Sequence, residues 1–327
     1  MNTIINFLFA AIKAGTPLLL GTTGEIVTEK SGSCNLGVEG LMYMGAFMGF
    51  FVGYATNSVL LALLAAFLIG VFGSFIFAFI TVTLQGNQNV TGLTLTIFGT
   101  GFAVFFGEQL IRHVNGGNPK LTTEFCEKLA EKPIPLLSDI PYIGKVLFTH
   151  NILVYFAVVV ALLCWIYLKY TRWGLHTRSV GENPAAADAS GLNVTLIKYL
   201  NVMLGGGICA LGGAYIALIN GNGVWNNGCI NGQGWIAVAL VIFARWSPAK
   251  SILGSLVFGA FSVFQVRAND FADTFPALSF LSKIPNAFYV MLPFVITALV
   301  LIITSMSKKR VGGQPEACGV NYYREER

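Results

Sequence analysis

The sequence predicts an all-α integral membrane protein with about nine transmembrane helices (about 8 to 10), arranged as two inverted repeats with broken helices. Apolar residues fill 55% of the 327 positions and charged residues only 11%, whereas a soluble domain carries roughly a quarter charged residues. Two polar, glycine-punctuated segments, 24–40 and 226–234, interrupt the apolar sequence, one in each half. Matched interruptions of this kind point to a transport pathway between the repeats.

Apolar runs of roughly 17 to 25 residues predict the individual spans, because a helix of that length crosses the hydrocarbon core. The first 24 residues lack a basic region and a small-residue cleavage site, so we expect them to form the first span. The seventh run is short and begins in glycines and asparagines, which indicates a broken or tilted helix. The runs occupy residues 4–24, 37–56, 58–83, 89–112, 151–168, 196–221, 233–246, 251–267 and 286–306.

The distribution of lysine and arginine predicts the orientation of these spans. Basic residues concentrate in loop 169–198, in the turn at 245–250 and in the tail 307–327, which places all three in the cytoplasm. Loop 113–150 mixes acidic and basic residues, as expected of an extracytoplasmic loop. The N-terminus then lies outside and the C-terminus inside, unless a further half-span near 25–36 reverses the N-terminus.

The spacing of the spans predicts one permease domain over residues 1–327, built from a first repeat (4–112) and a second repeat (196–306). An offset of about 194 residues aligns the spans and places Glu39-Gly40 on Gln233-Gly234. Five spans separate equivalent elements, so the second repeat is upside down relative to the first.

Ionisable side chains are nearly absent from the predicted spans, although proton or sodium coupling usually needs them there. Lys13, Glu39, Glu108 and Arg245 either lie close to span ends or have a long side chain that can reach the membrane interface. No phosphate-loop motif is present, the six cysteines form no C-x-x-C pair, and no basic patch is interleaved with aromatic residues. These patterns predict no cofactor, no metal site and no nucleic-acid partner. If the protein pumps, its energy comes from another polypeptide.

The cytoplasmic loop contains the signals of a short capped helix over residues 183–191. Asn183 is a helix cap, Pro184 suits the first helical position, and Gly191 follows the end. So short a helix is unstable alone in water. Either a groove of a partner or the protein's own cytoplasmic ends must hold it, and the sequence leaves both alternatives open.

Five motifs follow one another along the chain, at residues 31–32, 35–40, 87–92, 181–191 and 232–240. In this order they resemble the permease subunits of ABC importers, in the branch with the ribose, branched-chain amino acid and nucleoside permeases. The resemblance covers about residues 10–306. The lipoprotein-fed purine nucleoside group is the most similar, because its members carry a comparable E-x-S-G-x-x-N-L-G-x-E-G segment, which here is residues 29–40.

The resemblance implies a multi-pass protein of the bacterial plasma membrane in which two permeases, the same chain twice or a paralogue, form the pore. It also implies a cytosolic ABC ATPase that hydrolyses ATP and an extracytoplasmic substrate-binding lipoprotein. The permease itself is then no enzyme. The residues assigned to ATPase coupling are Arg178, Gly181, Glu182, Asn183, Pro184, Asp188 and Gly191.

Amide and carboxylate groups near the interruptions are candidates for the substrate pathway, because they exchange hydrogen bonds with sugar hydroxyls or base edges without binding tightly. The alternative is that they satisfy backbone groups at broken helix ends. Two tryptophans flank the second interruption, where they either stack on a nucleobase or anchor at the membrane interface. The candidates are Asn35, Glu39, Asn87, Gln88, Asn89, Trp225, Asn231, Gln233 and Trp235.

The sequence therefore predicts the permease of an ABC importer for nucleosides or related sugar-like molecules. The alternative is a self-sufficient channel or facilitator for a small polar solute, which would have no need of the capped helix at 183–191. An intramembrane enzyme is disfavoured, because no His pair, Ser/Lys or Asp/Asp arrangement lies within the spans at helical spacing.

Overall fold

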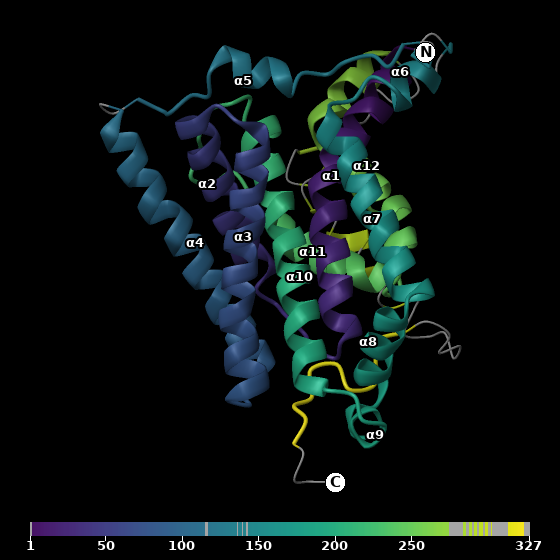
Figure 1. The fold of residues 1–327 in the computed structure, drawn as a ribbon. Helices are drawn as coiled ribbons and strands as arrows, with labels where there is room; N and C mark the ends of the chain where they lie inside the picture. Colours follow the sequence, from purple (N-terminus) through teal and green to yellow (C-terminus); the bar gives the residue numbers. More distant parts are fainter. Residues whose placement is uncertain are drawn as a thin grey trace.

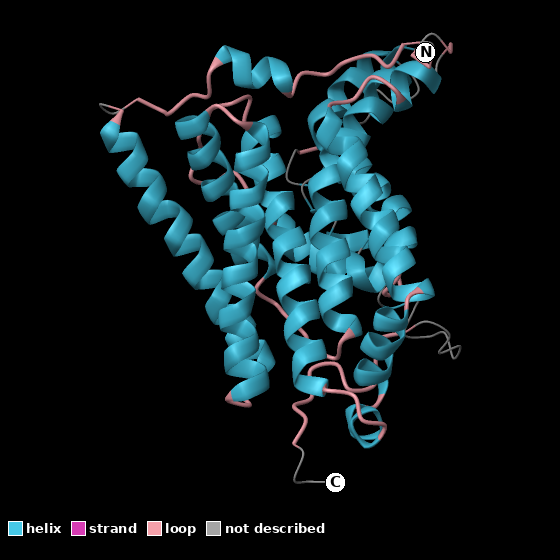
Figure 2. Cartoon of the chain, in the orientation of Figure 1, coloured by secondary structure: helices cyan, strands magenta, loops and turns pink. Residues whose placement is uncertain are grey.

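In the computed structural model the chain is a bundle of long helices that run between two ends (Figures 1 and 2). The structure describes residues 2–114, 117–135, 137–138, 140–141, 143–274 and 313–323, with short pieces between 284 and 302. Within these residues there are helices and one isolated bridge but no strand, which confirms the predicted all-α class. The elements are α1 (Asn2–Lys30), α2 (Val38–Thr56), α3 (Val59–Ala78), the π-helix η1 (Phe79–Thr83), α4 (Gln88–His113), α5 (Thr123–Lys128), α6 (Ile143–Leu147), α7 (Ile152–Tyr170), α8 (Arg172–Glu182), α9 (Pro184–Ala189), α10 (Val194–Tyr215), the π-helix η2 (Ile216–Asn220), α11 (Gln233–Phe243) and α12 (Pro248–Thr274).

Among the described residues, six helices are long and apolar enough to cross a membrane. They are α1, α2, α3 with η1, α4, α7, and α10 with η2, and they match the first six predicted spans. The predicted short seventh span is α11, with 11 residues. The eighth lies in α12, which continues to Thr274. The ninth, 286–306, falls largely outside the described residues.

The first polar interruption is shorter than predicted. Helix α1 continues without a break to Lys30, so only residues 31–37 separate it from α2, and no half-span lies near 25–36. The polar residues of 24–30 remain helical because they face protein rather than lipid. A Cβ on Gly24 would lie 2.3 Å from the carbonyl oxygen of Gly205, so α1 and α10 touch there backbone to backbone.

The prediction that ionisable side chains avoid the spans was wrong for α1. Glu25 is 1% exposed and Glu29 is 5% exposed, and both lie inside the bundle. The Glu29 carboxylate accepts a hydrogen bond from Trp246 Nε1, and Glu25 Oε1 accepts one from the backbone N–H of Asn35 at 3.0 Å. The prediction failed because it ended the first span at residue 24, before both carboxylates.

Small residues set the main helix contacts. Helices α1 and α12 pack closely at Gly15 and at Gly259, where an added Cβ would lie within 2.4 Å of a backbone oxygen of the other helix. Helix α3 packs on α10 at Gly70, whose Cβ would lie 2.5 Å from the carbonyl oxygen of Gly206. Such glycines allow membrane helices to approach closely, and they hold α1 and α10 at the centre of the bundle.

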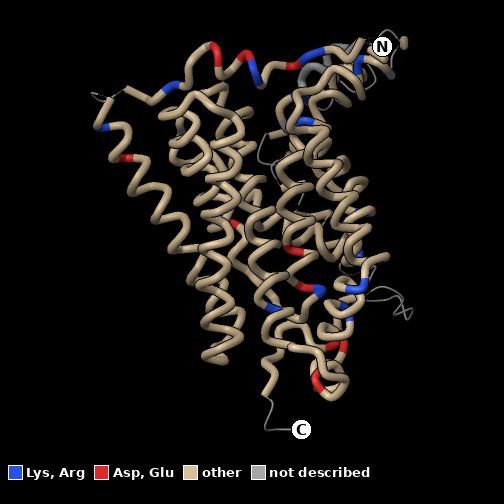
Figure 3. The backbone as a smooth tube through the Cα atoms, in the orientation of Figure 1, with Lys and Arg blue, Asp and Glu red and all other residues tan. Residues whose placement is uncertain are grey.

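The two ends of the bundle carry different segments. The start of α1 lies at one end together with α5 and α6, whereas α8, α9 and the tail residues 313–323 lie at the other (Figure 1). Loops 113–150 and 169–198 are therefore on opposite ends, and the tail shares the end of loop 169–198. Lysine, arginine, aspartate and glutamate gather at these ends, and few lie between them (Figure 3), as expected of a protein that crosses a bilayer.

Candidate translocation pathway and coupling surface

The first turn of α2, directly after the first interruption, meets the second interruption inside the bundle through Glu39. Its Oε1 accepts a hydrogen bond from the N–H of Gly232 at 2.8 Å, and its Oε2 accepts one from Gly234 at 2.6 Å. These N–H groups lie at the start of α11, where a carboxylate is stabilised by free backbone donors and the helix dipole. Gly232 has φ +85°, a backbone conformation that favours glycine. Glu39 is only 6% exposed, so here it caps the broken helix.

Three other candidate pathway residues lie beside this junction between Glu39 and the start of α11, and they are less buried than Glu39. Asn231 and Trp235 are exposed and Gln233 is half-buried. The backbone N–H of Asn231 donates to Tyr43 Oη at 3.3 Å, and Asn231 has φ 47°, in the left-handed region that asparagine adopts more readily than most residues. The structure thus brings Asn231, Gln233 and Trp235 together with Glu39 at the second interruption.

Asn35 is buried in the first interruption and holds its turn. It is 1% exposed, and its Oδ1 accepts from the N–H of Gly37 at 2.8 Å. Within the described part of the chain, Asn35 Nδ2, Ser33 Oγ and Glu25 Oε2 are buried without a hydrogen-bond partner. Buried polar atoms without partners are costly, so the first interruption and the neighbouring part of α1 carry an energetic cost in this arrangement.

The asparagine and glutamine group at 87–89 is divided between two environments. Gln88 is buried, and its Oε1 accepts from the N–H of Cys34 at 2.7 Å, which ties α4 to the first interruption. Asn87 is exposed and caps α4 by accepting from the N–H of Val90 at 3.0 Å. Asn89 is also exposed. Only Gln88 of the three reaches an interruption.

Trp225 is part of the wall of the bundle rather than an open surface. It is 1% exposed and packs against Phe47 and Phe50 at centroid distances of 5.6 and 5.4 Å. Its Nε1 donates to Asn227 Oδ1 at 2.7 Å, and Asn227 Nδ2 donates to Glu108 Oε1 at 2.6 Å. Neither ring face is available for stacking on a ligand in this arrangement, and the sequence pattern gave no sign of the link to Glu108.

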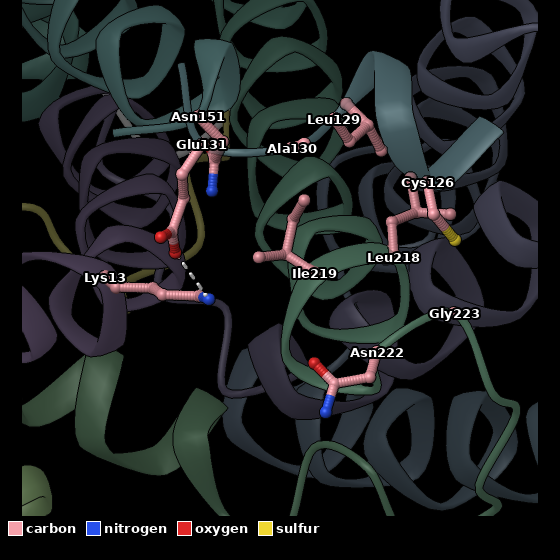
Figure 4. Close-up of a pocket in the computed structure, with 10 residues that line it drawn as sticks. All are labelled: Lys13, Cys126, Leu129, Ala130, Glu131, Asn151, Leu218, Ile219, Asn222 and Gly223. Carbon is pink, nitrogen blue, oxygen red and sulfur yellow. Dashed lines mark hydrogen bonds and ion pairs between the residues drawn. The ribbon is translucent and has the colours of Figure 1, made fainter. Parts of the chain in front are cut away.

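A cavity of about 290 Å³, lined by both polar and apolar residues, lies near the end of the bundle that carries α5 (Figure 4). Lys13 and Glu131 form an ion pair of 3.0 Å across it, which joins α1 to loop 113–150. Asn222 lies below the ion pair and Asn151 near Glu131. Lys13 lies within the predicted first span, and its partner Glu131 could not be found from the sequence because it lies 118 positions away.

The predicted capped helix is confirmed as α9. Asn183 Oδ1 accepts from the N–H of Ala186 at 2.9 Å, Pro184 occupies the first turn, and Gly191 has φ +83°. Ala187 is 4% exposed and packs with Val180, Val194 and Ile197, so the protein's own end holds one face of α9. The other face is exposed at Glu182, Asn183, Ala185, Ala186 and Ala189.

The remaining coupling candidates surround α9. Arg178 is exposed on α8. Gly181 is buried, and an added Cβ would lie 2.3 Å from the carbonyl oxygen of Lys30 at the end of α1. Glu182 Oε2 accepts from the N–H of Glu316 at 3.4 Å, and Asp188 Oδ2 accepts from Tyr322 Oη at 2.8 Å. Three residues of the tail, Glu316, Ala317 and Tyr322, thus contact this surface, which the sequence did not predict.

Comparison with known proteins extends over almost the whole chain. Residues 7–301 match the family described as branched-chain amino acid transport system / permease component. The nucleoside ABC transporter permease protein NupC of Lactococcus lactis subsp. cremoris is 34% identical, and the alignment covers 100% of this chain and 99% of the relative. The guanosine ABC transporter permease protein NupQ of Bacillus subtilis is 31% identical over 97% and 96%.

A further relative is the putative glucose ABC transporter permease protein TsgC13 of Haloferax volcanii, with 34% identity over 82% of this chain and 79% of the relative. No solved structure matches the chain. The relatives are transport subunits. Six of the described helices are long and apolar enough to cross a membrane, so the chain is a multi-pass membrane protein.

Proposed function

The chain belongs to the branched-chain amino acid transport system / permease component family, so it is a transport subunit of an ABC system and not an enzyme, and we propose that its substrate is a nucleoside. The observation that carries this proposal is the near full-length similarity to NupC and NupQ, whose names specify nucleosides and guanosine. The relative named for glucose makes a sugar the second candidate. Both substrates offer hydroxyl groups that amide side chains can bind.

The substrate route in this proposal runs past the second interruption. Asn231, Gln233 and Trp235 are its lining groups, since they are accessible beside a broken helix whose end Glu39 stabilises. Asn35 and Gln88 act behind them, as residues that hold the first interruption in place. Polar side chains beside unwound backbone are a common arrangement in transport pathways.

The proposed domain organisation is a pair of inverted repeats. In the 194-residue alignment α1 is equivalent to α10, and α12 is equivalent to α3. The contact of α1 with α12 is therefore equivalent to the contact of α10 with α3, and both contacts are present. Helices α1 and α10 run in opposite directions (Figure 1). Helices α2 and α11, the equivalent carriers of the interruptions, meet at Glu39 and Gly234, close to the pair that the 194-residue offset aligns. This packing supports an axis of pseudo-symmetry in the membrane plane.

The end with α8, α9 and the tail is cytoplasmic in this proposal, because loop 169–198 carries the basic residues. The membrane is the bacterial plasma membrane. A cytosolic ATPase binds the exposed face of α9, a second permease completes the pore, and a substrate-binding lipoprotein delivers the ligand at the α5 end. The exposed face of α9 beside Glu182 supports this arrangement, since a facilitator would need no such surface.

The test is co-purification of the protein from its native membrane, followed by identification of the bound chains. Ala186→Arg places a large cation on the exposed face of α9, and we expect it to lower ATPase recovery severalfold. Ala130→Arg, an exposed alanine at the other end, is the matched control and should leave recovery unchanged.

Substrate assignment requires uptake of labelled guanosine in cells, with unlabelled nucleosides or glucose as competitors. Competition by nucleosides alone supports the proposal, and competition by glucose alone favours the sugar. If no ATPase is recovered with the unaltered protein while guanosine uptake continues after energy depletion, the facilitator is correct instead.

A further inference from the structure

Residues 315–322 of the tail form a strap across the end of the bundle that carries α8 and α9 (the yellow segment in Figure 1). The N–H of Ala317 donates to the carbonyl oxygen of Gly181 at 3.0 Å, and Ala317 is 9% exposed. Beside it, the position of a Cβ on Gly319 lies 3.8 Å from Cys34 Cβ in the first interruption. The strap is therefore packed on both α8 and the start of the first interruption.

One side of the strap is bonded to the coupling surface. Tyr322 Oη donates to Asp188 Oδ2 on α9 at 2.8 Å. The ring of Tyr322 also packs on the apolar cluster that contains Val180 and Ala187. A charge-assisted hydrogen bond and a ring contact together fix Tyr322 to α9.

The other side is bonded to the turn between η1 and α4. Asn321 Nδ2 donates to the carbonyl oxygens of Gln85 at 2.6 Å and Gly86 at 3.1 Å. Its Oδ1 accepts from Gln88 Nε2 at 3.1 Å, and Gln88 in turn accepts from the N–H of Cys34. The carbonyl oxygen of Tyr322 accepts from Gln85 Nε2 at 3.1 Å. Asn321 therefore connects the strap to α4 and, through Gln88, to the first interruption.

We propose that Asn321 and Tyr322 are coupling residues, through which a displacement of α9 moves the η1–α4 turn and the first interruption. This inference rests on the proposed function, in which an ATPase binds α9. The two residues are chain neighbours, so their Cα atoms are about 3.8 Å apart and cannot separate. A shift of α9 that Tyr322 follows must then pull on Gln85, Gly86 and Gln88 through Asn321. A chain of bonded groups of this kind is the physical requirement for coupling between distant sites.

The test uses the complete transporter reconstituted in vesicles, with its ATPase and binding protein, and measures substrate molecules transported per ATP hydrolysed. Tyr322→Phe removes only the hydroxyl that binds Asp188, and Asn321→Ala removes the bonds to the turn. We expect each to lower the ratio about fivefold, which corresponds to ~1 kcal/mol or one net hydrogen bond. Tyr323→Phe and Val320→Ala alter exposed neighbours in the same segment and should keep the normal ratio.

The ratio distinguishes coupling from folding, because a purely structural loss lowers transport and hydrolysis together. Normal ratios in both Tyr322→Phe and Asn321→Ala would overturn the inference, even in a complex that transports well. Absence of ATPase from the unaltered complex would instead refute the proposed function.

Hydrogen exchange supplies a second measurement that needs no variant. In the unaltered complex, ATP should change the exchange of residues 317–322 together with that of α9. A change in α9 alone, with the strap unaffected, would also overturn the inference.

Discussion

Gly234 should be among the least replaceable positions of the chain, because α2 and α11 meet there without room for a side chain. A Cβ on Gly234 would lie 2.4 Å from Glu39 Cα and 2.6 Å from Glu39 N. These are backbone atoms of a helix, so they cannot move aside as a flexible side chain can. The substitution Gly234→Ala must therefore separate the two helices.

The magnitude follows from two contributions. Overpacking of a closed contact costs about 1 to 3 kcal/mol. Separation also weakens the bond from Gly234 N to the Glu39 carboxylate, now 2.6 Å, and a hydrogen bond to a charged group contributes about 1.5 to 3 kcal/mol. We expect Gly234→Ala to lower the free energy of unfolding by about 3 kcal/mol or more.

The assay is the apparent Tm of the protein in lipid nanodiscs, with uptake measured in parallel. Gly228→Ala is the matched control, since the nearest atom to its added Cβ is Asn226 Oδ1 at 3.8 Å. It lies in the same interruption and should change stability by less than about 0.5 kcal/mol. Equal Tm values for the two variants would refute the reasoning that the junction is closed by a glycine contact.

Three further predictions concern separate parts of the molecule. Glu39→Gln retains only one strong acceptor for the two N–H groups at 2.8 and 2.6 Å, so it should cost about 2 kcal/mol; a Tm equal to that of the unaltered protein would contradict the capping role. Asn183→Ala removes the α9 cap, so it should lower the free energy of unfolding by about 1 kcal/mol and lower ATPase recovery. Asn183→Asp keeps the acceptor oxygen, so its stability and its ATPase recovery should stay normal. Burial lowers the pKa of His150, which stacks on Phe9 at 4.4 Å; since the unfolded chain binds the proton more readily, stability should fall as pH drops below about 6.5, and His150→Gln should flatten that dependence of Tm on pH.

Much of the helix pattern could be predicted from the sequence because its signals are local. The first six spans are apolar runs whose length alone suits a membrane. The cap at Asn183, Pro184 and Gly191 lies within nine residues, and α9 forms there as predicted. The short α11 after Gly232 follows from the glycines and asparagines before it.

The partners of the polar residues could not be predicted, because they are distant in the chain. Glu39 binds N–H groups 193 and 195 positions away, and Asn321 binds Gln85 across 236 positions. The sequence also ended the first span too early, since Glu25 and Glu29 look incompatible with a membrane helix until α10 and Trp246 cover them.

The sequence by itself determined that the six long apolar helices, the short α11 and the capped α9 form, since apolar length and helix caps act over a few turns. The tertiary structure alone decided which polar groups are buried, which are paired and which remain accessible. The physical reason is that a carboxylate or amide is tolerated inside the bundle only when distant segments supply its hydrogen bonds. The closure of the junction by Glu39 and the strap at Asn321 and Tyr322 both depend on such contacts.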